Sequence, residues 1–399
     1  RDRLRKLRAT EDETVLSGSE LAARLRRHKT SNAGGTVGWA TRKKQKPEEE
    51  EDGEELLRSS APILAAKSAR LPRAALDVER LKDANKEDVS DAVIQVVKFH
   101  PNSQLMLTAS LDKRLKLFQV DGKHNSKVQS VFFEDLPILS ASFSADGSEV
   151  YVAGRRKFFY IYDLAAARIS KVEGLFGSQD KRLGELLVAP DGSQIAILGS
   201  LGTVNILSAK TKQKVGDLKM NGDVRCAAFT PDGRGLFTGG QGGIVYHWDM
   251  RMRRCVRKIV DEGAINVTSL ACSSVGGILA VGSQSGVVNT YDTSSWDSMT
   301  LGPAGEIRPA SRKGIMNLTT PVSTLRFNPD SQMLVAASHA TKEALRVVHT
   351  DSSSVFANWP TSGTPLHSVS AADFSPNSRF LSIGNDRGKV LLYRLRHYT

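Results

Sequence analysis

One short pattern recurs seven times in this chain of 399 residues, and it limits the possible folds more than any other feature. Each copy is an apolar strand that usually ends in Phe, then a turn resembling Pro-Asp-Gly, then a second apolar strand. The copies are "VVKFHPNSQLMLTAS" (96–110), "ASFSADGSEVYVAG" (141–154), "LLVAPDGSQIAILGS" (186–200), "AAFTPDGRGLFTGG" (227–240), "LACSSVGGILAVGS" (270–283), "LRFNPDSQMLVAAS" (325–338) and "ADFSPNSRFLSIGN" (372–385). The strand-end residues are Phe99, Phe143, Val188, Phe229, Cys272, Phe327 and Phe374, and the steps between them are 44, 45, 41, 43, 55 and 47 residues. A period of this size indicates a supersecondary unit whose copies stack and bury each other's apolar faces.

Most units continue into a third strand, as in "LDKRLKLFQVD" (111–121) and "GGIVYHWD" (242–249). The second of these ends in the dipeptide Trp248-Asp249. This dipeptide and a period of about 40–45 residues are typical of WD40 repeats, and the single long step indicates an insertion near 295–318. We therefore predict an all-β fold in which residues 91–399 form a seven-bladed WD40 β-propeller, each blade a four-stranded antiparallel sheet around a central channel. A β-sandwich with similar turns is the alternative, which seven units in register disfavour.

The end of the chain, "NDRGKVLLYRLRHYT" (385–399), leaves the seventh unit with three strands. A sheet that ends there exposes a row of unpaired backbone groups at its edge. The segment before the first repeat, "RAALDVERLKDANKEDVSDA" (73–92), can supply the missing outer strand. We therefore predict a propeller domain over 73–399 that is closed by a strand at about 75–81.

Residues 1–72 have a different composition and are predicted to form an extended, charged arm. Residues 1–46 hold 13 Lys and Arg against 5 Asp and Glu, and "EEEEDGEE" (48–55) follows with seven acidic side chains. Opposed charge blocks of this kind favour a solvated, extended segment.

Within the arm, the spacing of Ser17 and Glu20 fits a capping box and predicts a short helix at about 18–28. A stripe of two leucines cannot stabilise an isolated helix of this length, so we expect it to dock on a partner. The candidate docking residues are Leu21, Arg24, Leu25, Arg26 and Arg27.

The formal charge of +12 favours a polyanionic partner such as RNA. In the arm, "TRKKQK" (41–46) is a candidate RNA-binding or nuclear import segment through Arg42, Lys43, Lys44 and Lys46. In the repeats, the candidate phosphate contacts are Arg155, Arg156, Lys157, Arg253 and Arg254, with a further pair at 181–182. Each run can equally be a solvated linker or strand edge.

The sequence contains no arrangement typical of an enzyme, and we predict no catalytic, cofactor or metal site and no small-molecule substrate. It lacks G-x-x-x-x-G-K-[ST], G-x-S-x-G and H-E-x-x-H. The glycine-rich "GGQGG" (239–243) lies between two predicted strands and is explained by a hairpin turn. Three cysteines are too few for a disulfide framework and favour a reducing compartment. No apolar run reaches the roughly 18–20 residues of a membrane helix, so we predict no membrane association.

Two short motifs suggest partners. "WDMR" (248–251) fits the Trp-Asp-x-Arg ending of substrate receptors of cullin-type ubiquitin ligases, which is the alternative function. A WD40 strand end followed by Arg is the explanation that we favour. "LFQVD" (117–121) has the form of peptides that dock on exosome-associated RNA helicases. A docking peptide must be free, however, and this one is predicted to lie within a strand.

Several stretches go beyond what WD40 geometry requires. They include "LRATEDETVLSGSELAARLRRH" (7–28), "RLKDANKEDVSDAVIQVVKFHP" (80–101), "NWPT" (358–361) and "LYRLRHY" (392–398). On these stretches, which run from the arm to the last strand, the chain closely resembles the U3 small nucleolar RNA-associated protein 18 family. The fifth repeat departs from the usual pattern, because "ACSSVGG" replaces Phe and Pro.

The resemblance implies a non-enzymatic scaffold of the small-subunit processome, in the nucleolus. The implied partners are the other WD40 and helical-repeat proteins of the UTP-B subcomplex, the 5′ external transcribed spacer of pre-rRNA, and the U3 small nucleolar ribonucleoprotein. The family's docking peptide for an exosome-associated RNA helicase lies in an N-terminal tail and is not present as a free segment in these residues.

Overall fold

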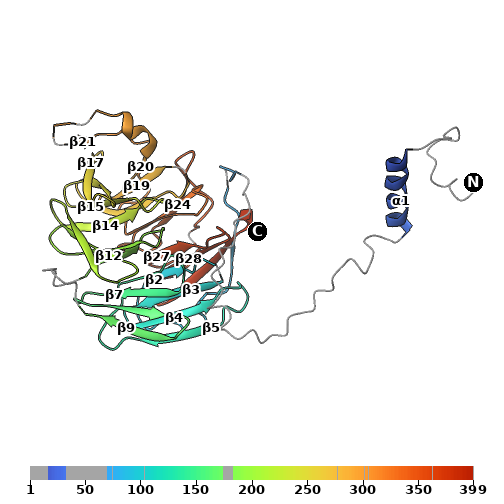
Figure 1. The fold of residues 1–399 in the computed structure, drawn as a ribbon, viewed down its shortest axis with the longest axis horizontal. Helices are drawn as coiled ribbons and strands as arrows, with labels where there is room; N and C mark the ends of the chain where they lie inside the picture. The colour runs from blue at the N-terminus through green and yellow to red at the C-terminus, as the bar shows by residue number, and fades with distance from the viewer. Residues whose placement is uncertain are drawn as a thin grey trace, which may run out of the picture. The chain divides into compact units, whose positions relative to one another are not determined.

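The structure is a computed structural model that describes residues 17–32, 70–73, 75–102, 104–173, 183–275, 277–300, 302–303, 305–361 and 363–398. Its strands form seven sheets, which follow one another around a ring in chain order (Figure 1). The prediction of a seven-bladed WD40 propeller is confirmed.

The first three blades each contain four antiparallel strands, which follow one another from the channel outward. Blade one has β2 (Ile94–Phe99), β3 (Leu105–Ser110), β4 (Arg114–Gln119) and β5 (Lys127–Phe132). Blade two has β6 (Ser140–Phe143), β7 (Glu149–Ala153), β8 (Phe159–Asp163) and β9 (Arg168–Val172). Blade three has β10 (Leu186–Val188), β11 (Gln194–Leu198), β12 (Thr203–Ser208) and β13 (Lys214–Lys219).

Blades four and five share the predicted insertion. Blade four has β14 (Val224–Phe229), β15 (Gly235–Gly240), β16 (Ile244–Asp249) and β17 (Arg254–Val260), and β21 (Glu306–Ile307) adds a fifth, parallel strand outside β17. Blade five has β18 (Val267–Cys272), β19 (Ile278–Ser283), β20 (Val288–Asp292) and β22 (Lys313–Ile315). Between β20 and β21 the chain forms the 3-10 helix η2 (Thr293–Ser298). The insertion therefore covers the edge of its neighbour.

The last two blades complete the ring. Blade six has β23 (Thr324–Phe327), β24 (Met333–Ala337), β25 (Leu345–His349) and β26 (Ser354–Val355). Blade seven has β27 (Val369–Phe374), β28 (Phe380–Asn385), β29 (Val390–Leu395) and β1 (Val78–Arg80), and the 3-10 helix η3 (Arg396–Tyr398) follows β29.

The repeat pattern forms this fold because alternate residues of an inner strand face opposite ways. The terminal Phe points into the packing between blades, and Phe99, Phe143, Phe327 and Phe374 are all buried. The turn that follows needs a residue with positive φ, which Gly147 supplies in blade two (φ +76°). A Cβ there would collide with the ring of His100, whose Nε2 lies 2.9 Å from the Gly147 carbonyl oxygen. His100 is therefore a packing residue.

Blade seven is closed by β1, which pairs antiparallel with β29 as its outermost strand. The sequence places the closing strand at about 75–81, and β1 spans Val78–Arg80. Just upstream, Leu76 is buried, and its backbone N–H and C=O both bond the side-chain amide of Asn358, at 3.1 and 2.8 Å. Leu71, which the sequence analysis assigns to the arm, is buried in the same apolar cluster. Packing therefore begins at least two residues before the predicted boundary at 73.

The helix of the arm is α1 (Gly18–Asn32), which runs four residues beyond the predicted end at 28. Ser17 caps the helix as expected, because the Glu20 N–H donates to Ser17 Oγ at 3.4 Å, but the second bond differs from that of a capping box: Ser17 Oγ, and not its backbone N–H, donates to Glu20 Oε2, at 3.0 Å. Leu25 is 47% exposed, and the side chains of Arg26 and Arg27 lie outside the described residues. No described helix is long and apolar enough to cross a bilayer.

Candidate functional site

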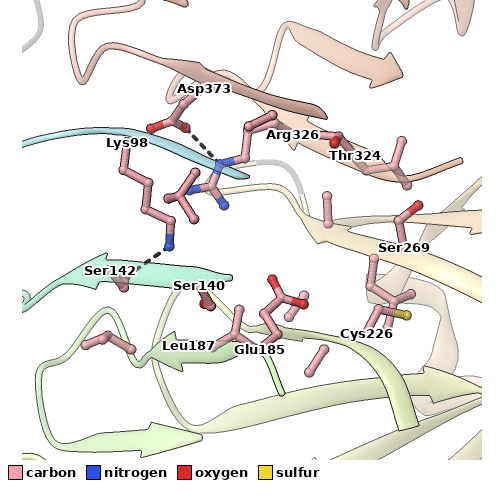
Figure 2. Close-up of a pocket in the computed structure, with 18 of the residues that line it drawn as sticks. Lys98, Ser140, Ser142, Glu185, Leu187, Cys226, Ser269, Thr324, Arg326 and Asp373 are labelled. Carbon is pink, nitrogen blue, oxygen red and sulfur yellow. Dashed lines mark hydrogen bonds and ion pairs between the residues drawn. The ribbon is translucent and has the colours of Figure 1, made fainter. Parts of the chain in front are cut away.

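The central channel is lined by the inner strands of the blades and encloses about 840 Å³. Five charged side chains from different blades line it, together with Ser142; one of them is Arg155, and Figure 2 labels the other four. Arg326 Nε donates to Asp373 Oδ1 at 2.9 Å, and Lys98 Nζ donates to Ser142 Oγ at 3.0 Å. Glu185 is the fourth charged group. The channel lining therefore holds three cations, Arg155 included, and two carboxylates.

The surrounding protein changes how readily these groups ionise, although Glu185 and Arg326 are exposed to the channel and Lys98 is half-buried. Burial, and then the charge of Arg326, lower the pKa of Lys98 to about 8. Burial raises the pKa of Glu185, against the influence of Lys98 and Arg326. The Asp373 carboxylate raises the pKa of the Arg326 guanidinium. These shifts follow from desolvation and from charges placed close together.

The contact between Lys98 and Ser142 resembles the serine–lysine pair of some hydrolases, but the Lys98 amine is in the wrong protonation state for that chemistry. A serine nucleophile needs a neutral base, and an amine with a pKa of about 8 is mostly protonated at pH 7. The contact is therefore a hydrogen bond from an ammonium to a hydroxyl. Among the described residues, no group of three or more His, Cys, Asp or Glu side chains could hold a metal ion.

Sequence reasoning missed the charged residues of the channel, although the repeat contained a signal for them. Lys98, Arg326 and Asp373 each precede the terminal Phe of their inner strand, and Ser142 occupies the same place in blade two. Since that Phe faces the packing between blades, the residue before it faces the channel. Charge at this position of the repeat identifies the channel lining.

Positive charge gathers on the outer strands of three consecutive blades. The strands β9, β13 and β17 contain seven Lys and Arg against one acidic residue, Asp217; these are Arg168, Lys171, Lys214, Lys219, Arg254, Arg257 and Lys258. Arg168, Lys171, Lys219 and Arg254 are exposed. Exposed apolar side chains alternate with them at Ile169, Val215 and Val256. We call β9, β13 and β17 together the basic rim.

Arg253 and Arg254, predicted as phosphate contacts, lie on or next to the basic rim. Arg254 is the first residue of β17. Arg253, in the preceding turn, donates from Nη1 to the carbonyl oxygen of Val215 on β13 at 2.7 Å. This bond connects the outer edges of blades three and four, so Arg253 has a structural contact beside any role in binding.

The other predicted cations lie elsewhere. Arg155, Arg156 and Lys157 are exposed in the turn between β7 and β8, away from the outer strands. Arg42, Lys43, Lys44 and Lys46 fall outside the described residues, as does the pair at 181–182. In α1, Leu21 and Arg24 are half-buried and Leu25 is exposed. Among the predicted cations that the structure describes, those of the β7–β8 turn and those beside β17 lie in different blades and do not form one patch.

Both short motifs have structural explanations. In "WDMR", Trp248 is buried and donates from Nε1 to Thr238 Oγ1 at 2.8 Å. Asp249 accepts from the backbone N–H of Arg251 at 2.8 Å, which fixes the turn into β17. In "LFQVD", Leu117 and Phe118 are fully buried in blade one.

Comparison with known proteins places the chain in a family. The family model described as WD domain, G-beta repeat matches residues 86–119 and 212–249. An Arabidopsis thaliana protein named U3 small nucleolar RNA-associated protein 18 homolog is 42% identical over 407 residues, covering 100% of this chain and 73% of that protein. The human homolog is 38% identical, covering 97% of this chain and 69% of its own length. This chain belongs to the U3 small nucleolar RNA-associated protein 18 family.

The family relation extends beyond plants and animals. The probable U3 small nucleolar RNA-associated protein 18 of Schizosaccharomyces pombe is 34% identical, over 99% of this chain and 77% of its own length. Coverage of this extent includes the arm as well as the ring. The U3 small nucleolar RNA-associated protein 18 family is of a non-enzymatic type.

Proposed function

We propose that this chain is a non-catalytic scaffold subunit of the small-subunit processome, the 90S pre-ribosome. In this role it is needed for pre-rRNA processing and for maturation of 18S rRNA, and it acts in the nucleolus. The observation that carries the proposal is the family relation, which spans the whole chain at 42% identity. The names of these relatives indicate association with U3 small nucleolar RNA and hence a role in ribosome biogenesis.

The proposed partners are the other WD40 and helical-repeat subunits of UTP-B, the 5′ external transcribed spacer and the U3 small nucleolar ribonucleoprotein. A closed propeller supports this role because it offers rigid faces and loops on which several partners can dock. We assign to α1 the docking of a neighbouring subunit, through Leu21, Leu25 and the arginines around them. Its exposed Leu25 lacks a covering group within the described helix.

The basic rim supports a direct contact with RNA. Arg168, Lys171, Lys219 and Arg254 are exposed there, and cations that neutralise phosphates release condensed counterions. The single carboxylate of these strands, Asp217, leaves their net charge strongly positive. We infer that the rim follows the backbone of structured RNA, without reading its bases.

The test is to purify the tagged chain gently from cells and to sequence the RNA that accompanies it. We expect enrichment of U3 small nucleolar RNA and of unprocessed 5′ spacer. Removal of residues 1–46 should reduce entry into the large particle, because it removes α1. Absence of RNA, with a ubiquitin ligase adaptor dominating the eluate, would reject the scaffold function and make Arg251→Ala the next variant.

A further inference from the structure

A second cavity, of about 460 Å³, lies between blades one and two and has no role in the proposed function. In an antiparallel blade, the turn from the second to the third strand and the connection to the next blade lie at the same end. The cavity opens at that end, because Leu111 and Arg155 belong to such turns and Pro137 to such a connection. Its described lining residues are Gln95, Leu111, Pro137, Leu139, Arg155 and Arg156, of which Gln95, Leu139 and Arg155 also line the central channel, so the cavity adjoins the channel mouth.

One side of this cavity is aliphatic. Leu111 is 38% exposed because it lies in the turn between β3 and β4 and not within a strand. Its backbone N–H donates to the Val93 carbonyl oxygen at 3.4 Å, which ties the turn to the start of blade one. With Pro137 and Leu139, it forms an apolar wall that can bury one or two aliphatic side chains.

The other side of the cavity carries two arginines on an anchored turn. The Arg156 carbonyl oxygen accepts from the Leu183 N–H at 3.0 Å, and the Arg156 N–H donates to the Gly154 carbonyl oxygen at 2.7 Å. Gly154 lets this turn approach the opposite wall, since a Cβ there would collide with the Pro137 carbonyl oxygen. Within the part of the chain that the structure describes, no carboxylate lies within 4.0 Å of either guanidinium. Both guanidinium groups can therefore donate hydrogen bonds to the carboxylates of a partner molecule.

The composition of the lining favours a peptide over RNA. Single-stranded RNA binds by stacking its bases on aromatic side chains, and none of the six described lining residues is aromatic. An aliphatic wall beside two guanidinium groups instead fits an aliphatic side chain flanked by carboxylates, which pair with arginine through strong, often bidentate hydrogen bonds. We propose that this cavity binds a short acidic segment of a partner protein, which inserts a leucine-like side chain beside Leu111 and places its carboxylates on Arg155 and Arg156.

The experiment measures fluorescence anisotropy of a labelled octapeptide, two adjacent leucines flanked on each side by three glutamates, with the complete 399-residue chain. Matched peptides replace the leucines by serines or the glutamates by lysines, and a labelled oligouridylate serves as the RNA arm. The variant pair Arg155→Glu and Arg156→Glu is compared with Arg168→Glu and Arg254→Glu, which changes the net charge equally on the basic rim. A milder pair, Arg155→Gln and Arg156→Gln, replaces the first if that one fails to fold.

We expect the first pair to weaken binding of the acidic peptide at least about tenfold, and the rim pair to change it less than about twofold. Replacing the leucines by serines should weaken it by a similar factor, because the apolar wall is then not used. Equal loss in both variant pairs would reduce the effect to general charge attraction and overturn the proposal. Oligouridylate binding that depends on Arg155 and Arg156, without peptide binding, would overturn it in favour of an RNA site.

Discussion

The strands β1 and β17 each pair with the third strand of their blade on its outer side, but they differ in length, charge and burial. β1 has three residues. It is preceded by the buried Leu76, whose backbone forms two hydrogen bonds with the side chain of Asn358. β17 has seven residues, including three cations, and exposes Val256 at 45%. Both are fourth strands, but β1 is outermost and closes the ring, whereas β17 has the two-residue β21 beside its Lys258 and Ile259 and presents charge to solvent along the rest of its length.

This contrast shows that the repeats determine the blades, whereas the non-repeat stretches determine how the ring is closed. "NWPT" and "LYRLRHY", which WD40 geometry does not require, contain the residues that hold the closing segment. Asn358 bonds Leu76, and the rings of Trp359 and Tyr393 meet at 5.0 Å. Arg394 and Arg396 lie 3.8 and 3.6 Å from Glu79 of β1. The family-specific residues of blade seven are therefore explained by ring closure.

The largest expected effect is on the free energy of unfolding, and it compares the segment that closes the ring with the basic rim. Leu76→Ala should lower the free energy of unfolding by about 3 kcal/mol, because it leaves a cavity beside the closing strand. Val215→Ala on β13, where the side chain is 41% exposed, should cost less than about 0.5 kcal/mol. Urea unfolding followed by tryptophan fluorescence measures both. Similar losses in the two variants would show that β1 is no more important to the ring than a strand of the basic rim.

The next effect concerns RNA. Changing Arg168, Lys171, Lys219 and Arg254 together to Glu should weaken binding of 5′ spacer RNA roughly 100-fold at about 150 mM salt. It should also reduce the slope of log affinity against log salt by about 3, since each lost phosphate contact contributes about 0.7 to 0.9.

The matched control reverses four exposed cations of blades five to seven, namely Lys313, Lys342, Arg387 and Lys389. Electrophoretic mobility shifts over a salt series compare the two variants. If the control loses as much affinity as the rim variant, binding depends on total charge and the rim is not the site.

The sequence predicts most of the fold because each inner strand and its turn repeat the same constraints. A terminal Phe must be buried and Gly147 must adopt positive φ, so the spacing of these residues counts the blades. The outer strands carry no such requirement. Arg168 and Arg254 lie far apart in the sequence, and only the placement of β9 and β17 in nearby blades relates them. For this reason local runs such as 155–157 and 251–258 predict the rim incompletely.

The insertion gives a second limit. β21 pairs with β17 in parallel, through Lys258 opposite Glu306 and Ile259 opposite Ile307. Its two residues are too few to show periodicity, so length alone indicates an insertion without indicating where it packs.

The smallest predicted effect compares a cation of the channel with a cation of the basic rim. The pKa of Lys98 is about 8 in the folded protein against an ordinary value of 10.5, so the unfolded chain binds this proton more tightly. Below pH 8 both states are protonated and the folded state bears the full cost of the buried charge. As the pH rises from about 8 towards 10.5 this cost disappears, so the free energy of unfolding should rise by roughly 2 kcal/mol between pH 8 and 10 relative to Lys98→Met.

Urea unfolding between pH 7.5 and 10 checks this difference, with Lys171→Met on β9 as the control. Lys171 is exposed, so the wild-type chain and that variant should follow parallel curves. A constant difference between the wild-type chain and Lys98→Met would mean that water enters the channel freely. Its charged side chains would then behave like those of the rim, and the channel would be as accessible to a partner as an exposed surface.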